Sequence, residues 1–365
     1  MITQVSIKNF KCLRDVTVNL ERFTVFVGAN GSGKTSILGA IHNAIRAVTG
    51  EPQKVFAHER HGDWVYTRGG VGDLSIACRT EGGEFRVEAT PPKGYPPDPE
   101  LLQKGLWQYR IIPQGPELER AIRPARKMAF LALNASELAK PSYSDHNPPR
   151  MEYDGEGLAS MLAFMALNTP DAFAELVDIA RGLIPRLKRI RFRKAPVPRT
   201  ETEFVRFGAD TVERRIRRML QGELILLDFD HAENVSARTA SEGTLLILGL
   251  LAALLGPTRP RILLMDDIEH GLHPLAQEKL VKVVGGLMDR FSDLQLLATS
   301  HSPYLLDYLS PDQVRVVSSG PDGYAVCGRL MDHQKFDKWK DELHPGEMWS
   351  IFGEQWVAGT EVATK

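Results

Sequence analysis

The sequence predicts an α/β fold built on a mixed, largely parallel sheet, with an antiparallel β lobe and a helical insertion lobe. Three observations support this class. A short apolar strand near the N-terminus runs into a glycine-rich loop and then an amphipathic helix, the last third alternates strands with helices, and β-branched residues mark short strands elsewhere. The 365 residues, 43% of them hydrophobic, suffice for one large domain with insertions or for two domains.

Composition limits the partners and the compartment. The net charge is -1, so any contact with nucleic acid must be local. Cys12, Cys78 and Cys327 lie far apart without C-x-x-C spacing, which argues against a disulfide framework or a zinc site. The N-terminus lacks the apolar core of a signal peptide, and the longest apolar run, 245–256, is shorter than the roughly 20 residues that cross a bilayer. We expect a cytoplasmic protein without a membrane partner.

The first half of the chain should form the strand, loop and helix and then an antiparallel lobe. Period-two alternation predicts strands at 4–10, 16–20 and 23–27, and an apolar stripe predicts a helix at 34–48. The stretches "DLSIACRT" and "EFRVEAT" are strand-like, and the proline-rich "PPKGYPPDPE" that follows favours a loop.

The second half should contain an insertion and then the rest of the parallel sheet. Helices are expected at about 156–168 and 171–182, and "RIRFRKAPVP" and "EFVRFG" resemble two exposed strands. Strands "RILLMDD", "LQLLATS" and "QVRVVS" then alternate with helices. We expect a single head composed of an N-terminal lobe at 1–135, an insertion at 136–222, a C-terminal lobe at 223–330 and a helical tail at 331–365.

The stretch "GANGSGKTS", residues 28–36, contains G-x-x-x-x-G-K-[ST] between a strand and a helix. Its glycines allow a backbone path in which successive N–H groups point at phosphate oxygens. Lys34 is expected to reach the β- and γ-phosphates, and the Thr35 hydroxyl to bind Mg2+. The predicted nucleotide-binding residues of the loop are Asn30, Gly31, Ser32, Gly33, Lys34, Thr35 and Ser36.

Acidic residues follow the apolar strand in "RILLMDDIEHGLHP". Asp266 is placed to coordinate Mg2+, and Asp267 to orient or deprotonate an attacking water. Glu269, just beyond, is a third candidate with a catalytic role. Asp is also common where a strand breaks into a turn, but together with the phosphate-binding loop the pair indicates a metal site.

Two further stretches are typical of phosphate contacts. In "SEGTLLILGLL", Ser241, Glu242 and Gly243 open a long apolar helix. They suit a capped core helix, and also a helix N-terminus that meets the γ-phosphate of a nucleotide on another subunit. In "LLATSHSPYLLD", His301 follows a strand and could contact the γ-phosphate or the attacking water, although a capping loop remains an alternative.

These elements, in this order, resemble the ABC-type ATPase heads of the SMC and RecF families. More closely, "IKNFKCLRD", "NGSGKTS", "SEGTLLILGLL", "DDIEHGLHP" and "TSHSPYLLD" resemble AAA-family (AAA_21-like) ATPases related to the overcoming-lysogenization-defect (OLD) proteins. The resemblance implies a P-loop fold of the ABC type with ATP and Mg2+ as cofactors. It assigns Walker A to residues 28–36, the signature to 241–243, Walker B to Asp266 and Asp267, the D-loop to 271–274 and the switch histidine to His301. Lys11 resembles a residue that approaches the nucleotide in such heads.

The resemblance also implies partners. Family members form head-to-tail dimers that sandwich two ATP molecules, so we expect a nucleotide-dependent homodimer or a higher oligomer. A separately encoded effector, such as a nuclease or toxin in anti-phage defence, is the expected partner. One departure matters: Asp267 stands where Glu is usual, and its shorter side chain favours slow hydrolysis, or a non-hydrolysing scaffold. A RecF-like DNA repair ATPase is the alternative, and a transporter ATPase subunit ranks last.

Three local features stay open. Residues 181–199 hold eight Arg or Lys and no acid, and strand alternation puts Arg189, Arg191 and Arg193 on one face, which suits a nucleic-acid backbone. A solvated strand face balanced by the acids at 201–203 is slightly favoured over that interpretation. The Q-loop residue is either Gln108 or Gln114. In the tail, Trp339, Trp349, Phe352 and Trp356 are expected to form a helical cap on the sheet, with an aromatic docking patch as the weaker alternative.

Overall fold

The computed structural model describes residues 1–50, 52, 55, 65–67, 69–91, 108–207 and 210–359, with the backbone alone for 201–207 and 210–213. The expected proline-rich loop, residues 91–100, lies outside the described residues except for Pro91. The chain forms two compact units. The first contains Met1–Phe130, Pro260–Glu269 and Pro274–Lys365, and the second contains Leu131–Arg259 and His270–His273. The fold class is mixed α/β, as the sequence predicts.

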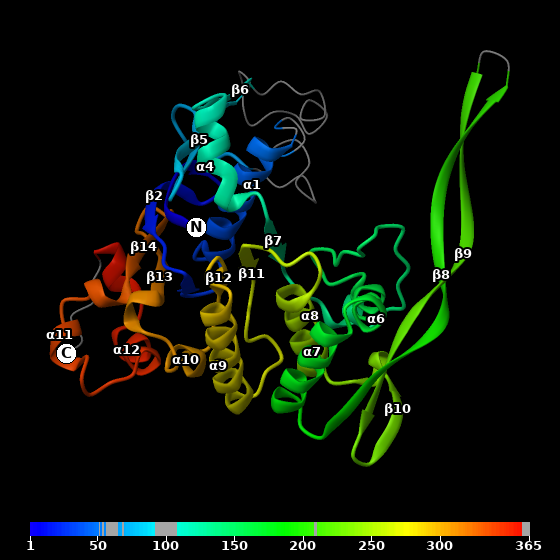
Figure 1. Cartoon of the computed structure of the whole chain (residues 1–365). Coiled ribbons are helices and arrows are strands. Elements are labelled where there is room, and N and C mark those ends of the chain that lie inside the picture. Colours follow the sequence, from blue (N-terminus) through cyan, green and yellow to red (C-terminus); the bar gives the residue numbers. More distant parts are fainter. Residues whose placement is uncertain are drawn as a thin grey trace. The chain divides into compact units, whose positions relative to one another are not determined.

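A six-stranded sheet in the order β14-β13-β3-β12-β11-β7 carries the motifs of the first unit (Figure 1). Its strands are β3 (Phe23–Val27), β7 (Met128–Leu131), β11 (Ile262–Met265), β12 (Gln295–Thr299), β13 (Val314–Ser319) and β14 (Ala325–Arg329). Strands β13, β3, β12 and β11 run parallel to one another, and β14 pairs antiparallel with β13. Every residue of β3, β11 and β12 is buried, which is typical of parallel strands covered on both faces. Parallel pairing brings the carboxyl ends of these three strands to one edge.

A five-stranded antiparallel sheet, in the order β2-β1-β4-β5-β6, forms the expected antiparallel lobe. Its strands are β1 (Ile2–Phe10), β2 (Leu13–Asn19), β4 (Leu74–Thr80), β5 (Gly83–Thr90) and β6 (Gln108–Ile112). Helix α1 (Lys34–Thr49) packs against strands of both sheets. Its buried stripe, which includes Ile37 and Ile41, joins Ile7 of the antiparallel sheet and Phe26 of the parallel sheet in one core. Helix α4 (Pro116–Ile122) packs on β5, and η1 (Arg123–Ala125) follows it.

The remaining helices of the first unit follow the parallel strands. They are α9 (Pro274–Arg290), α10 (Pro303–Leu306), η3 (Pro311–Gln313), η4 (Leu330–Asp332), α11 (Phe336–Trp339), α12 (Pro345–Phe352) and η5 (Gln355–Ala358). Helix α12 packs on α10, and η5 packs on β13 and β14. In the expected helical tail, η5 thus contacts the sheet, whereas α12 contacts α10 and α11 contacts η4.

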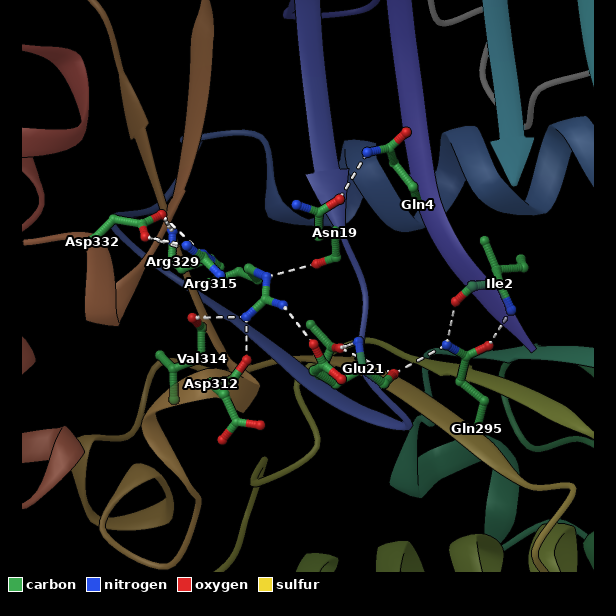
Figure 2. A network of polar contacts seen from close by, with 11 residues as sticks. Ile2, Gln4, Asn19, Glu21, Gln295, Asp312, Val314, Arg315, Arg329 and Asp332 are labelled. Atoms are coloured by element: carbon green, nitrogen blue, oxygen red, sulfur yellow. Dashed lines mark hydrogen bonds and ion pairs between the residues drawn. The ribbon is translucent and has the colours of Figure 1, made fainter. Parts of the chain in front are cut away.

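Two buried polar side chains tie the two sheets together through backbone groups (Figure 2). The Gln295 amide, fully buried, accepts from the N–H of Ile2 at 2.9 Å and donates to the carbonyls of Ile2 and Glu21 at 2.7 and 3.0 Å. Arg315, 1% exposed, donates to the carbonyl of Asn19 at 2.7 Å and to that of Asp312. Burial lowers the pKa of this guanidinium. These bonds fix β1 and β2 against the parallel sheet because buried polar groups require partners.

The second unit consists of helices and a three-stranded sheet in the order β10-β9-β8. Its elements are α5 (Ala135–Leu138), α6 (Leu158–Asn168), α7 (Pro170–Leu183), β8 (Leu187–Phe207), β9 (Asp210–Phe229), β10 (Ala232–Ser236), η2 (Ala237–Thr239) and α8 (Glu242–Leu255). Helix α8 is buried at every residue from Thr244 to Leu255, and α5, α6 and α7 pack against it. It is thus the centre of this unit.

Strands β8 and β9 form one long twisted hairpin, which is drawn in green in Figure 1. Both predicted stretches lie in a strand, but they belong to the same one, because β8 is continuous over 21 residues and passes through Pro196 and Pro198. Proline lacks the N–H that a central strand would need, but β8 is an edge strand with only β9 as neighbour. The two prolines therefore do not interrupt it.

Candidate functional site

The loop after β3 has the backbone of a phosphate cradle. Gly28, Gly31 and Gly33 have φ of 149, 76 and 108°, and a Cβ on Gly28 would lie 2.0 Å from the Val317 carbonyl oxygen. Glycine is therefore required at the first position both by conformation and by space. No side chain caps the N-terminus of α1, and no acid lies in its first turn. The N-terminal N–H groups of α1 are thus suited to an anion.

Two side chains of the loop fit a polyphosphate. Lys34 is 5% exposed, and its ammonium donates to the carbonyls of Gly28 and Ala29 at 2.9 Å each. Burial lowers the pKa of Lys34, while the carboxylate of Asp267 opposes that shift most strongly. Ser32 is 2% exposed, and its hydroxyl has no hydrogen-bond partner among the described residues. A phosphate oxygen bound in this loop would give this buried hydroxyl a hydrogen-bond partner.

Oxygen atoms suited to Mg2+ meet at the ends of β11 and α1. The Thr35 hydroxyl donates to the two carboxylate oxygens of Asp266 at 2.9 and 3.1 Å. Asp266 is the first residue after β11, and Thr35 lies in the first turn of α1. Carboxylate and hydroxyl oxygens are the hard donors that Mg2+ prefers, beside phosphate oxygens. The residues present therefore fit the metal that the sequence predicts.

Thr299, the last residue of β12, organises both aspartates, and sequence reasoning missed it. Its hydroxyl donates to Asp266 Oδ1 at 2.6 Å and accepts from the N–H of Asp267 at 2.8 Å. Asp267 has φ 51°, a left-handed conformation that is uncommon for a non-glycine residue and often marks a functional site. No local sequence signal marks Thr299, because its role depends on the pairing of β12 with the P-loop strand β3.

His301 and Glu269 complete this edge of the sheet. The Nε2 atom of His301 lies 3.7 Å from Asp267 Oδ1, with both side chains partly exposed. Glu269 accepts the His301 backbone N–H at 2.6 Å, and its second carboxylate oxygen is buried without a partner among the described residues. The geometry thus gives Glu269 a positioning contact with His301. The structure brings Lys34, Thr35, Asp266, Asp267, Glu269 and His301 together within the first unit.

The turn between β1 and β2 lies beside the phosphate-binding loop. The Cys12 thiol is 3.6 Å from the Ser36 hydroxyl, and a Cβ on Gly33 would lie 3.0 Å from Cys12 Sγ. Lys11, next in the turn, has φ 51°. Its ammonium lies 5.7 Å from the centre of the Phe10 ring. The predicted nucleotide-approaching residue therefore sits on a turn that contacts the start of α1.

The predicted signature residues belong to the second unit. Ser241 caps α8 by accepting from the N–H of Thr244 at 3.3 Å. A Glu242 carboxylate oxygen lies 3.1 Å from His270 Nε2, and a Cβ on Gly243 would lie 2.7 Å from the Gly271 carbonyl oxygen. The signature glycine therefore allows close approach to the predicted D-loop.

The three arginines of the predicted basic face differ in exposure and in bonding. Arg189 and Arg193 are exposed, whereas Arg191 donates to the carboxylate of Asp228 at 2.6 Å. Asp228 is 3% exposed, and this bond lowers its pKa. Arg191 therefore has a structural partner at the root of the hairpin. On the opposite face, Ile190 is buried, as strand alternation predicts.

The two Q-loop candidates lie in the antiparallel lobe. Gln108 is the first residue of β6, and Gln114 lies in the turn before α4. No described helix is long and apolar enough to cross a membrane. Among the described residues there is also no cluster of three His, Cys, Asp or Glu side chains that could hold a metal by themselves.

A strand, a glycine-rich loop with a buried lysine, and an aspartate bound to the loop threonine define a P-loop ATPase head. The chain belongs to the AAA_21 family, described as "AAA domain, putative AbiEii toxin, Type IV TA system", whose model matches residues 23–307. Its AAA domain carries the P-loop motifs that the sequence predicts.

Known relatives agree with this class. An OLD nuclease of Thermus scotoductus is 31% identical over 107 residues, which cover 25% of this chain and 20% of that protein. The match therefore spans about a fifth of the relative's length. An SMC head bound to the C-winged helix domain of ScpA shares 15% identity at a TM-score of 0.56, over 92% of this chain and 99% of that chain. An SMC head of Pyrococcus furiosus, bound to the C-terminal domain of ScpA, shares 12% identity at a TM-score of 0.56, over 93% and 99%. These likenesses establish the fold.

Proposed function

We propose that the protein is an ATP-dependent switch that binds ATP with Mg2+, hydrolyses it slowly and controls a separate effector. The observation that carries this proposal is the meeting of Lys34, Thr35 and Asp266 at one edge of the sheet. Lys34 and the N–H groups of the loop would bind the phosphates, and Thr35 and Asp266 would hold Mg2+. When bound, Mg2+ would neutralise phosphate charge during transfer.

Slow hydrolysis follows from the residues around the attacking water. Asp267 would orient or deprotonate this water, and His301, 3.7 Å away, would hydrogen-bond the water or the γ-phosphate. Glu269 would hold His301 through its backbone N–H. The side chain of Asp is one methylene shorter than that of the Glu that is usual here. Its carboxylate would therefore lie farther from the attacking water than is best for removing a proton. A slow step suits a switch, whose bound state must persist.

Dimerisation would complete the site. The N-terminus of α8, with Ser241, Glu242 and Gly243, would bind the γ-phosphate of a nucleotide held by a second copy. The positive end of a helix dipole favours such an anion, although Glu242 requires a partner for its charge. His270, 3.1 Å from Glu242, is placed to be that partner. The product is a head-to-tail homodimer or a higher oligomer that forms with ATP.

The proposed effector is a nuclease or toxin of an anti-phage system in the cytoplasm. The family description names a toxin system, and the curated relative is an OLD nuclease. An ATP-dependent change in mass and contact surface is the signal that such an effector could read. The test is to mix the purified chain with a nuclease encoded beside it. If the two proteins form no complex and ATP does not change DNA cleavage, the effector is removed from the proposal.

The ATPase part is tested separately by phosphate release. Wild type should release phosphate slowly, Lys34→Ala should lose both binding and turnover, and Asp267→Asn should bind ATP without turnover. Equal turnover in wild type and Asp267→Asn would exclude the proposed role of Asp267. Phosphate release that persists in Lys34→Ala would exclude this loop as the site.

A second candidate function, direct DNA binding in repair, is favoured by the hairpin of β8 and β9. Residues 187–229 hold eleven Lys and Arg against six Asp and Glu, in a chain of net charge -1. Beyond the predicted Arg189, Arg191 and Arg193, four arginines of β9 are exposed: Arg214, Arg215, Arg217 and Arg218. The hairpin is on the order of 65 Å long, and a two-stranded ribbon fits the major groove of duplex DNA.

The DNA candidate has its own test. Replacing the four arginines of β9 by Gln should weaken binding to a 30-base-pair duplex. The slope of log K against log salt should also become less steep, by the amount expected for about four lost phosphate contacts. The Arg189→Gln/Arg193→Gln variant shows whether the root of the hairpin contributes as well. Unchanged affinity in the fourfold variant would exclude the hairpin as the DNA contact.

A further inference from the structure

A carboxylate from the far end of the chain contacts the phosphate-binding loop. The backbone N–H of Ala29, the second residue of that loop, donates to Glu354 Oε2 at 2.7 Å. The two residues are separated by 325 positions in the sequence. Both belong to the first unit. A carboxylate here engages a loop whose free N–H groups otherwise suit phosphate oxygens.

The chain directs Glu354 toward the loop by a sharp turn after α12. Helix α12 ends at Phe352, and Gly353 follows with φ 66°, a conformation that favours glycine. Glu354 occupies the capping position of η5, but its side chain makes no capping bond there. The side chain bonds Ala29 instead. This carboxylate is therefore used for contact with the P-loop.

A cluster of three rings, from His333, Phe352 and Trp356, holds the turn in place. The Trp356 ring lies against the backbone of β14, where a Cβ on Gly328 would lie 3.5 Å from it. Trp356 Nε1 donates to the Gly353 carbonyl at 3.2 Å. The His333 ring stacks on Phe352 at 3.9 Å between ring centres and lies edge-on to Trp356 at 5.1 Å. A hollow of about 410 Å3, lined by Trp356, Val357 and Cys327 among others, lies beside these rings.

The same segment also contacts the helix that follows the switch histidine. The N–H of Gly346, in the first turn of α12, donates to Asp307 Oδ1 at 2.9 Å. Asp307 is the C-terminal cap of α10, which begins two residues after His301. Residues 345–358, called the C-terminal segment below, thus contact two elements beside the site: the P-loop through Glu354 and α10, which follows His301, through Gly346.

The charge of Glu354 conflicts with a bound polyphosphate. Glu354 accepts from the N–H of Ala29 at 2.7 Å, and the Lys34 ammonium donates to the carbonyl of the same residue at 2.9 Å, so the carboxylate and the lysine contact the same part of the loop. A polyphosphate bound to the same loop would bring several negative charges close to this carboxylate. Like charges at such separations repel, and the repulsion is greatest where water is excluded.

We infer that Glu354 competes with ATP for the phosphate-binding loop, so that nucleotide binding releases the C-terminal segment. This inference rests on the proposed nucleotide site and adds a device by which a partner could read that site. Glu354 lowers the affinity for ATP. When it leaves the loop, the ring contacts of Trp356 and the hydrogen bond between Gly346 and Asp307 of α10 are released as well. The released segment is the surface that differs between the empty and the ATP-bound head.

The test compares Glu354→Gln with wild type in calorimetric titrations with Mg2+ and the non-hydrolysable analogue AMP-PNP. Glutamine keeps an oxygen acceptor for the Ala29 N–H but removes the charge, so the Kd should fall about three- to tenfold. Asp337→Asn is the matched control. It removes a carboxylate from α11, where Asp337 pairs with Lys340, and should leave the Kd unchanged. An unchanged or higher Kd in Glu354→Gln overturns the inference.

Hydrogen exchange supplies an independent measurement on the wild type. On addition of Mg2+ and AMP-PNP, the amides of residues 345–358 should exchange about fivefold faster or more, while those of α1 become slower. Unchanged or slower exchange in the C-terminal segment, together with slower exchange in α1, would overturn this inference and leave the ATP site intact. If neither wild type nor Glu354→Gln binds AMP-PNP, the proposed nucleotide site is wrong, and this inference is wrong with it.

Discussion

Replacement of Thr299 by valine tests how the two aspartates are held. Valine has nearly the same shape, so the change removes the hydroxyl and little packing. Two contacts disappear: the bond to Asp266 Oδ1 at 2.6 Å and the acceptor for the N–H of Asp267 at 2.8 Å. Thr299 is fully buried, so water does not replace them readily.

The magnitude follows from these two bonds. An N–H left without a partner, plus a lost charge-assisted bond, should lower the free energy of unfolding by about 2–4 kcal/mol. Asp267 would also lose the contact that holds its backbone at φ 51°. Residues that orient metal ligands in this way typically change metal affinity or activity by about 10- to 100-fold. We expect phosphate release in Thr299→Val to fall by a similar factor.

Urea denaturation and phosphate release, measured as a function of Mg2+ concentration, provide the assay. Thr299→Ser is the matched control because it keeps the hydroxyl, so it should retain the Mg2+ dependence while losing only the stability of one methyl group. The reasoning would be refuted if Thr299→Val kept wild-type turnover at every Mg2+ concentration. It would also be refuted if the serine variant lost as much turnover as the valine variant.

Two further predictions concern stability. Burial of His42 against Phe130 lowers its pKa to about 4. The histidine therefore stabilises the fold above the unfolded pKa of about 6.5, and the free energy of unfolding should fall by about 2 kcal/mol between pH 7.5 and 5. His42→Phe should flatten that part of the pH profile, and parallel profiles would contradict the assignment. Gln295→Leu removes three buried hydrogen bonds and should cost about 2–4 kcal/mol in urea denaturation, whereas Gln4→Leu, at an exposed contact, should cost less than about 0.5 kcal/mol. Equal losses in these two variants would show that the bonds of Gln295 do not tie the sheets together.

Local patterns were sufficient to predict the glycine-rich loop and the aspartate that its threonine contacts. Glycine spacing, the following lysine and the flanking strand and helix act within a few residues, so the P-loop can be read from one stretch. The prediction of Asp266 also depended on an apolar strand that is followed directly by acidic residues. Because parallel strands end at one edge of a sheet, its meeting with Thr35 was predictable before any distance was known.

Contacts that depend on the tertiary fold could not be predicted. Thr299 resembles any buried threonine until β12 is placed beside β3, because its role comes from strand order. The contact of Glu354 with Ala29 joins the two ends of the chain and has no local signature. The continuity of β8 was hidden by Pro196 and Pro198, whose effect depends on whether a strand lies at the edge of its sheet.

Light scattering with and without ATP and Mg2+ tests whether ATP drives dimerisation. Wild type should be monomeric without nucleotide and double in mass with ATP. Asp267→Asn should remain dimeric because it does not hydrolyse ATP, and Lys34→Ala should stay monomeric. A mass that ignores ATP in all three proteins would contradict the head-to-tail switch.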